Sequence, residues 1–238
     1  MPGILAAVFN VLVSVVLPVA VLAWLLIKKR WHHTLAFGLG VAAFVVSQNL
    51  LRLPLLSWLG SQLSFVAFAA RNPVLYTLLL CFSAGLFEET ARYAAMRLFM
   101  KGRTAPSYGI AFGIGHGGFE AAWLAGGPWL SALASQSLVL RHTSPLDILP
   151  SGVERLFAIA LHVGFSLVVL AAVRRKRPLL WLLAIALHGA ANTVVVFTLQ
   201  YTGNVWLCEG VMALATTAVL FIAARLSKDA PTQKEELP

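Results

Sequence analysis

Long apolar runs separated by short polar connections dominate the pattern of this chain. Seven runs are long enough to cross a hydrocarbon core of about 30 Å as helices, and they cover approximately residues 4–27, 34–51, 73–99, 105–125, 153–173, 178–200 and 204–225. No basic residue precedes the first run, whereas Lys28, Lys29 and Arg30 follow it, which is the reverse of a cleavable signal peptide. The pattern therefore predicts an all-α integral membrane protein of about seven transmembrane helices that retains its first helix.

The composition agrees with lipid as the solvent of this chain. Of its 238 residues, 59% are hydrophobic and only 11% are charged, whereas soluble domains carry about 25% charged residues. This excludes a soluble globular fold, and the high hydrophobicity also excludes a disordered chain. Cys81 and Cys208 both lie in apolar runs and are too few for a disulfide framework. We therefore expect a multi-pass protein of the cell membrane.

The positive charge predicts the orientation of the chain. The formal net charge is +9, but the Lys and Arg residues are unevenly divided between alternate connections. With the N-terminus outside, three of them lie in outer connections and twelve in inner ones: Lys28, Lys29, Arg30, Lys101, Arg103, Arg174, Arg175, Lys176, Arg177, Arg225, Lys228 and Lys234. Because Lys and Arg in short loops favour the cytoplasmic side, we expect an outer N-terminus and a cytoplasmic C-terminus. Anionic lipid headgroups, rather than nucleic acid, are then the expected partners of the basic loops.

The predicted organisation is a single transmembrane domain, residues 1–226, followed by a polar cytoplasmic tail, residues 227–238. Two outer connections are long. Residues 53–72 are apolar, but an eighth span there would turn residues 174–177 to the outside, so we predict an interfacial or re-entrant segment. Residues 126–152 begin with two glycines and a proline, and a lid over a cavity and a plain linker are equally consistent with them.

The scarce ionisable residues of the apolar runs lie at a common depth. Glu88, His116, His162 and His188 are each about 10 to 12 residues from the predicted cytoplasmic end of their helix, which is roughly 15–18 Å at 1.5 Å per residue. An ionisable side chain near the bilayer centre costs at least about 2.5–3.5 kcal/mol, so such residues are usually functional. Four helices are therefore predicted to deliver polar groups to one layer, around a polar active-site cavity within the bundle.

The spacing within two helices agrees with this interpretation. His116 and Glu120 are four residues apart, as are His188 and Asn192, so each pair shares one helix face. Either histidine alone is more typical of a hydrogen bond between helices than of a metal ligand. At one depth with glutamates, the histidines together favour a site.

Glu88 and Glu89 lie about 100° apart around their helix, so only one of them can face the site. Arg92 follows them by four and three residues and can neutralise the other one. With Glu120, the helices still carry about two negative charges more than positive ones, which proton uptake or a divalent cation would relieve. Since imidazole, carboxylate and amide oxygen all ligate Zn²⁺, the imidazoles favour a divalent cation, and zinc above others.

Three short motifs follow one another in helix order: paired glutamates followed by arginine at 88–92, F-x-x-x-H at 112–116 and H-x-x-x-N at 188–192. Together they resemble the motifs of the superfamily of CAAX prenyl proteases and bacteriocin-processing enzymes. Within that superfamily the chain is most similar to the YhfC-type intramembrane metalloproteases. The closer similarity rests on residues 85–93, on residues 113–120, and on Glu154-Arg155 followed by His162. It covers residues 73–200.

The resemblance implies a metal-dependent peptidase that hydrolyses peptide bonds of membrane-associated substrates with a glutamate-activated, metal-bound water. One glutamate of the pair would activate the water, while His116, His188 and Asn192 would hold the metal or orient the water. The candidate catalytic residues are therefore Glu88, Glu89 and Arg92, and the candidate metal ligands are His116, His188, Asn192, Glu120 and His162. The wider superfamily usually has one more residue between the glutamates and the arginine than this chain has.

Two other classes of function also use buried polar groups. A proton- or cation-coupled transporter needs buried carboxylates and histidines, but the chain has no inverted repeat and no matching pair of helices broken by Gly or Pro. A non-catalytic membrane scaffold is the third class. Glu154 and Arg155 lie near the outer interface, where neighbouring charges at a helix start are ordinary, so we interpret them as structural.

Overall fold

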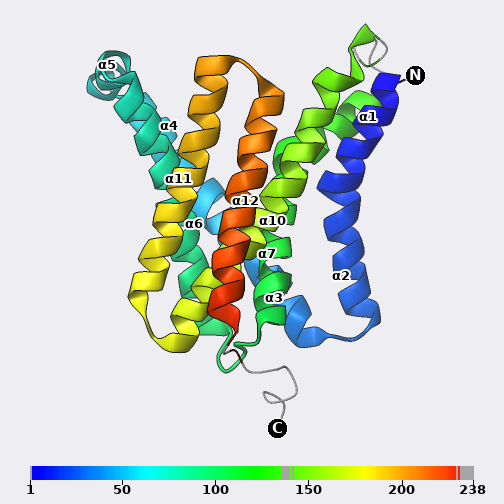
Figure 1. Cartoon of the computed structure of the whole chain (residues 1–238), viewed down its shortest axis with the longest axis vertical. Coiled ribbons are helices and arrows are strands. Elements are labelled where there is room, and N and C mark those ends of the chain that lie inside the picture. Colours follow the sequence, from blue (N-terminus) through cyan, green and yellow to red (C-terminus); the bar gives the residue numbers. More distant parts are fainter. Residues whose placement is uncertain (1, 136–139, 141, 229, 231–238) are drawn as a thin grey trace.

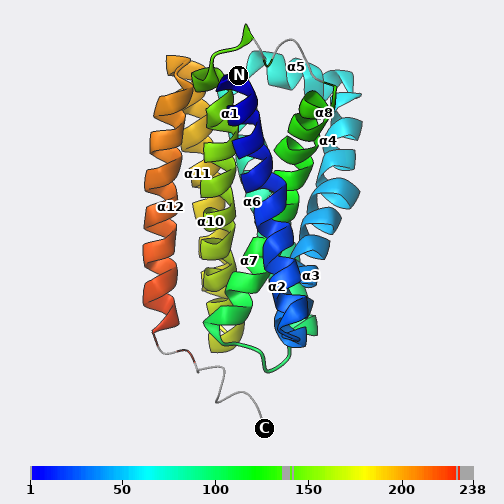
Figure 2. The ribbon, with the colours of Figure 1, turned by 90° about the vertical axis from the view of Figure 1, so that its right-hand side faces the viewer.

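The computed structural model describes residues 2–135, 140, 142–228 and 230, and every regular element in that part of the chain is a helix. The helices run alongside one another as one bundle (Figures 1 and 2). Six of the helical stretches described are long and apolar enough to cross a membrane: Pro2–Ile27, Trp31–Gly60, Pro73–Phe99, Pro145–Arg175, Pro178–Thr202 and Val205–Ser227. This confirms an all-α, multi-pass membrane protein. Most of the predicted tail, 227–238, lies outside the described residues, and the division into domain and tail stays a prediction.

The first span is a continuous rod of three segments, α1 (Pro2–Val11), the π-helical η1 (Leu12–Val16) and α2 (Leu17–Ile27). Pro18 stands near the start of α2. Because proline lacks an N–H, the helix widens into π turns before it instead of ending there. Near the other end of the rod, Asn10 Nδ2 donates to the Ile148 carbonyl at 2.8 Å and attaches α1 to a later helix.

The second span is longer than predicted. It joins α3 (Trp31–Phe44), the π-helical η2 (Val45–Arg52) and α4 (Leu53–Gly60), and the short α5 (Leu63–Arg71) follows it. The prediction of an interfacial or re-entrant segment is therefore wrong for residues 53–60, which continue the helix. Pro54 does not stop the helix because it lies in the first turn of α4, after a π turn that leaves its missing N–H without consequence. Within residues 53–71, it is α5 that lies across the end of the bundle (Figure 2).

A third rod, α7 (Pro106–Ala121), η3 (Ala122–Gly126) and α8 (Gly127–Ala134), also passes its predicted end at residue 125. The lid or linker expected at 126–152 is instead largely helical, since α8 reaches Ala134 and the next long helix starts at Pro145. Residues 136–139 and 141 of that segment lie outside the described part. This rod corresponds to the remaining predicted span, but its many glycines and polar residues leave it outside the six apolar ones, so the count of seven stays a prediction.

The other long helices are α6 (Pro73–Phe99), α10 (Pro145–Arg175), α11 (Pro178–Thr202) and α12 (Val205–Ser227). Of the six spans α10 is the most enclosed, with 67% of its apolar window buried. Pro150 lies inside α10 and frees a carbonyl four residues earlier, that of Leu146. Trp206 Nε1 of α12 donates to this carbonyl at 3.2 Å, so the neighbouring helix satisfies it.

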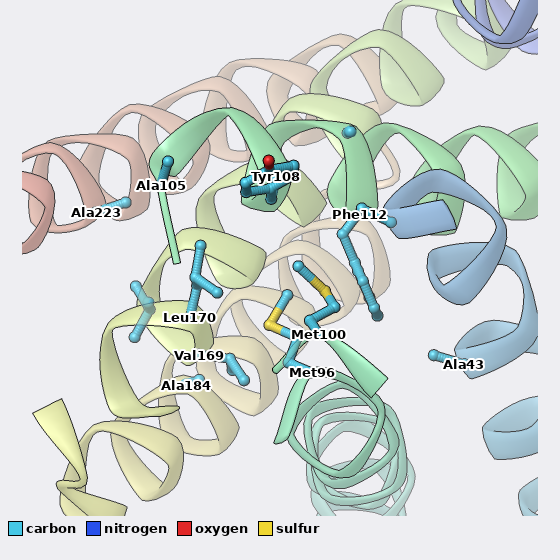
Figure 3. Close-up of a cluster of buried hydrophobic side chains, with 13 residues drawn as sticks. Ala43, Met96, Met100, Ala105, Tyr108, Phe112, Val169, Leu170, Ala184 and Ala223 are labelled. Atoms are coloured by element: carbon cyan, nitrogen blue, oxygen red, sulfur yellow. The ribbon is translucent and has the colours of Figure 1, made fainter. Parts of the chain in front are cut away.

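The largest buried apolar cluster among the described residues lies toward the end of the bundle that holds the C-terminus. There Met96 of α6 and Met100, which follows its last residue, meet Tyr108 and Phe112 of α7 (Figure 3). The backbones of α3 and α7 are in direct contact at Gly40, where an added Cβ would collide with the Phe112 carbonyl. Such close approach of small residues is typical of packing between membrane helices. It holds α7, with its polar residues, firmly inside the bundle.

Candidate intramembrane active site

The residues that the sequence singled out converge on one region. Glu88, Glu89 and Arg92 come from α6, His116 and Glu120 from α7, His162 from α10, and His188 and Asn192 from α11. All of them are buried except Glu120 and Asn192, which are partly buried. Four helices thus deliver polar side chains to one layer of the bundle, at the depth expected from the sequence.

Glu88 lies at the centre of this layer. Its Oε1 accepts a hydrogen bond from Gln48 Nε2 at 2.7 Å, and its Oε2 lies 3.0 Å from His116 Nε2. The same Oε2 is 3.9 Å from His162 Nδ1 and 4.0 Å from His188 Nε2. One carboxylate oxygen therefore faces three imidazole rings that come from three different helices.

Glu89 points to different partners. Its Oε1 lies 2.8 Å from His188 Nδ1, and its Oε2 lies 3.1 Å from Arg92 Nε. Arg92 is fully buried and also donates to the His162 carbonyl at 2.8 Å and to the hydroxyl of Ser166. The guanidinium thus neutralises Glu89 and leaves Glu88 as the glutamate of the pair that faces the imidazoles.

His162 is held from both sides. Arg92 Nη2 lies 3.1 Å from its Nδ1, and Glu120 Oε2 lies 2.8 Å from its Nε2. Because a guanidinium can only donate, Nδ1 accepts and Nε2 carries the proton that is donated to Glu120. Glu120 Oε1 in turn accepts from Arg155 Nη1 at 2.8 Å, and Arg155 also binds Glu154. Arg155 therefore reaches the cluster through Glu120, in addition to its pairing with the neighbouring Glu154.

The sequence analysis missed Gln48 and Arg52. Both lie on the second rod, where Arg52 Nη1 donates to Gln48 Oε1 at 3.0 Å and so turns the amide N–H₂ of Gln48 toward Glu88. Arg52 is itself fixed by Ser83 and by the Leu80 carbonyl, at 3.0 and 2.8 Å. The available signal was the polar pair Gln48-Asn49 inside an apolar run, with Arg52 one helical turn later.

A cavity of about 400 Å³ adjoins the cluster, with Glu88, Glu120, His162, His188 and Asn192 among its lining residues. From Glu88 it extends toward the end of the bundle that holds the N-terminus, where Arg52, Leu53, Glu154, Arg155 and Val196 line it. Several lining residues have large exposed fractions: Leu53 46%, Trp123 57% and Leu124 56%. The wall of the cavity thus combines the polar layer with exposed apolar side chains.

The side chains fit a divalent cation. Ligand atoms of Glu88, His116 and His162 all lie within 4.8 Å of one another, and nitrogen and oxygen donors of this kind suit zinc. His188 uses Nδ1 on Glu89 and turns Nε2 toward Glu88. His162 uses Nε2 on Glu120, while its Nδ1 lies 3.9 Å from Glu88 and accepts from Arg92. Metal-binding histidines typically have such a carboxylate behind them, because it sets the tautomer and the ring orientation.

Apolar helices that enclose a cluster of imidazoles and carboxylates beside a cavity define a polytopic membrane protein with an intramembrane polar site. The profile of the family described as YhfC intramembrane metalloprotease matches residues 13–139 and 129–212, which include every candidate residue. A membrane protein of Bacillus subtilis (strain 168) with the name YhfC is 32% identical over 209 aligned residues, 77% of this chain and 80% of the relative. No solved structure matches the chain significantly. The chain belongs to the YhfC intramembrane metalloprotease family, which confirms the YhfC-type resemblance; the wider CAAX relation stays a prediction.

Proposed function

We propose that this protein is an intramembrane metal-dependent peptidase that hydrolyses peptide bonds of membrane-associated substrates. The observation that carries the proposal is the Glu88 carboxylate, which faces the rings of His116, His162 and His188 beside a cavity of about 400 Å³. The family's description as metalloproteases supports the same chemistry. A transporter also needs buried charges, but no feature of the described helices favours transport over hydrolysis.

The imidazoles of His116 and His188 would hold the cation through the nitrogens that face Glu88. His162 would join them only if its Nδ1 turned from Arg92 to the cation. When bound, a divalent cation polarises the scissile carbonyl and makes a water molecule more acidic. Zinc is the cation that we expect, because imidazole and carboxylate are its usual ligands in proteins.

We assign Glu88 as the general base, since its Oε2 faces the site while Gln48 holds its Oε1. It takes a proton from the attacking water and returns that proton to the leaving amine. Glu89 and Glu120 act differently: they hold the outer nitrogens of His188 and His162. Arg92 pairs with Glu89 and holds it in place, so it is a positioning residue rather than a group that touches the substrate.

The lining of the cavity favours a substrate that comes from the membrane. Leu53, Trp123 and Leu124 both line it and contact the surroundings of the bundle, where lipid chains would lie. A peptide segment in lipid keeps its backbone hydrogen bonds inside a helix, so it must unwind before it is cut. The side-chain amides of Asn49 and Asn192 line the cavity and can pair with the backbone groups that unwinding frees.

Reconstitution tests this proposal directly. Purified protein in liposomes is mixed with a library of membrane-anchored peptides, and products are identified by mass spectrometry. We expect cleavage by the parent protein and a decrease of about 10²- to 10⁴-fold with Glu88→Gln, the contribution typical of a general base. Asp147→Asn, the same chemical change at an exposed position, is the control and should cleave normally. Cleavage that persists in Glu88→Gln would contradict the proposal. So would a parent protein that cleaves no peptide but conducts ions, with the ion flux lost in Glu88→Gln.

A further inference from the structure

A second cavity, of about 330 Å³, lies at the opposite end of the bundle from the mouth of the first. It is lined by Tyr93 and Arg97 of α6, Val173 of α10, Lys176, and Pro178 at the start of α11. Arg97 lies in the last turn of α6, and Lys176 and Pro178 lie between the end of α10 and the start of α11, so this cavity lies at the end of the bundle that holds the C-terminus (Figure 1). The sequence assigns that face to the cytoplasmic side.

Two cations face this cavity without an acidic partner. Arg97 and Lys176 are both exposed, and no acidic residue is among the lining residues. Arg97 Nη1 donates to the Tyr93 hydroxyl at 2.9 Å, and its guanidinium lies over the Tyr93 ring at 5.8 Å. These contacts orient the guanidinium but leave its charge uncompensated, and in the described part of the chain neither cation forms an ion pair. The cavity is therefore suited to an anion.

The cavity has firm walls. Tyr93 and Val173 both pack against the buried cluster of Figure 3. The Tyr93 ring also contacts that of Trp181 of α11 in a tilted arrangement, with ring centroids 5.7 Å apart. Lys176 has a left-handed backbone with φ of 52° and ends α10, and its N–H bonds to the last turn of that helix. The two cations thus project from fixed backbone positions of different elements.

The surroundings identify the source of the anion as lipid. Leu98 follows Arg97, Leu179 follows Pro178, and these leucines are 57% and 74% exposed, with Leu182 at 49%. Exposed leucines on a membrane protein face acyl chains, whereas the cations lie at the level of the headgroups. Basic cavities between helices on the cytoplasmic side are known to bind anionic headgroups. We propose that this cavity binds the phosphate group of an anionic membrane lipid.

Native mass spectrometry of the full chain in detergent tests the proposal. Phosphatidylglycerol and phosphatidylcholine are each titrated into the protein. We expect one phosphatidylglycerol molecule to bind at a concentration at least tenfold lower than one phosphatidylcholine molecule requires. The Arg97→Gln, Lys176→Gln double variant should lose this preference. The matched control is Lys28→Gln with Lys29→Gln, which removes the same charge from another exposed loop at the same end and should keep the preference.

Three results would overturn the proposal. An equal loss of preference in both double variants would indicate general electrostatic attraction. If millimolar inorganic phosphate displaced the bound phosphatidylglycerol as effectively as added phosphatidylglycerol does, the cavity would be a site for free phosphate. An unchanged preference in the Arg97, Lys176 variant would exclude this cavity. Circular dichroism of each variant, and the Lys176→Gln single variant, separate loss of binding from loss of folding. None of these outcomes depends on peptidase activity.

Discussion

His188 Nδ1 lies 2.8 Å from Glu89 Oε1, and Nε2 of the same ring lies 4.0 Å from Glu88 Oε2. Two glutamates that are neighbours in the sequence therefore face different nitrogens of one imidazole ring, Glu89 at Nδ1 and Glu88 at Nε2. Glu89, paired with Arg92, accepts the proton of Nδ1 and so leaves the lone pair of Nε2 directed at Glu88. His162 also has a carboxylate behind one nitrogen, Glu120 on Nε2, although its Nδ1 accepts from Arg92. Carboxylates thus fix the tautomers of both rings, and this is the structural argument for a metal centre.

The different partners of the two glutamates predict different effects of the same substitution. Glu89→Gln leaves the buried guanidinium of Arg92 without a counter-charge, so we expect the free energy of unfolding to fall by about 3–5 kcal/mol. Glu88 has no such ion pair with a Lys or Arg in the described chain, and Glu88→Gln should unfold close to the parent. Thermal unfolding in detergent measures both. Equal destabilisation by the two variants would contradict the division of tasks.

Metal content provides an independent check of the site. Elemental analysis of the purified protein should find about one equivalent of zinc per chain, as expected for a single catalytic site. His116→Ala and His188→Ala should each lose most of it, because each removes an imidazole that faces Glu88. His142→Ala, at an exposed histidine, should keep the metal. A chelator should abolish cleavage and added zinc should restore it; a parent protein without metal would refute the metal centre.

Gln48 predicts an effect on catalysis that a purely structural role would not produce. Gln48→Leu removes the hydrogen bond to Glu88 Oε1 and frees the carboxylate to rotate. We expect kcat to fall roughly 10- to 100-fold, in line with about 1.5–3 kcal/mol for a hydrogen bond to a charged group, with KM and zinc content almost unchanged. Gln200→Leu, the same change at an exposed position, is the control. A rise in KM alone would instead place Gln48 in substrate binding.

Two glycines of one helix predict opposite outcomes for stability. In Gly40→Ala the new methyl group would meet the backbone of α7 at Phe112 and His116, so we expect a loss of about 1–3 kcal/mol. In Gly38→Ala the methyl group meets nothing within 4 Å, and a helix former replaces glycine, so stability should stay or rise. Thermal unfolding of both variants compares them. Similar melting temperatures would mean that α3 and α7 adjust more freely than their contact indicates.

The prediction of the helix ends shows where sequence reasoning failed. The predicted spans end at residues 51 and 125, yet Pro54 and Pro128 both stand in the first turn of a segment that continues the rod after π turns. A single proline looks the same in the sequence whether the chain breaks or widens there. The choice depends on whether the neighbouring helices offer a surface along which the rod can continue.

The sequence by itself determined the apolar helices and the shared depth of Glu88, His116, His162 and His188, because hydrophobic length and residue spacing are local properties. It also determined that only one of two adjacent glutamates can face a site. Only the tertiary structure decided that this one is Glu88 and that Gln48, 40 residues away, holds it. The reason is physical: helix geometry fixes the angle between neighbouring side chains, but the rotation of each helix depends on the packing of its partners.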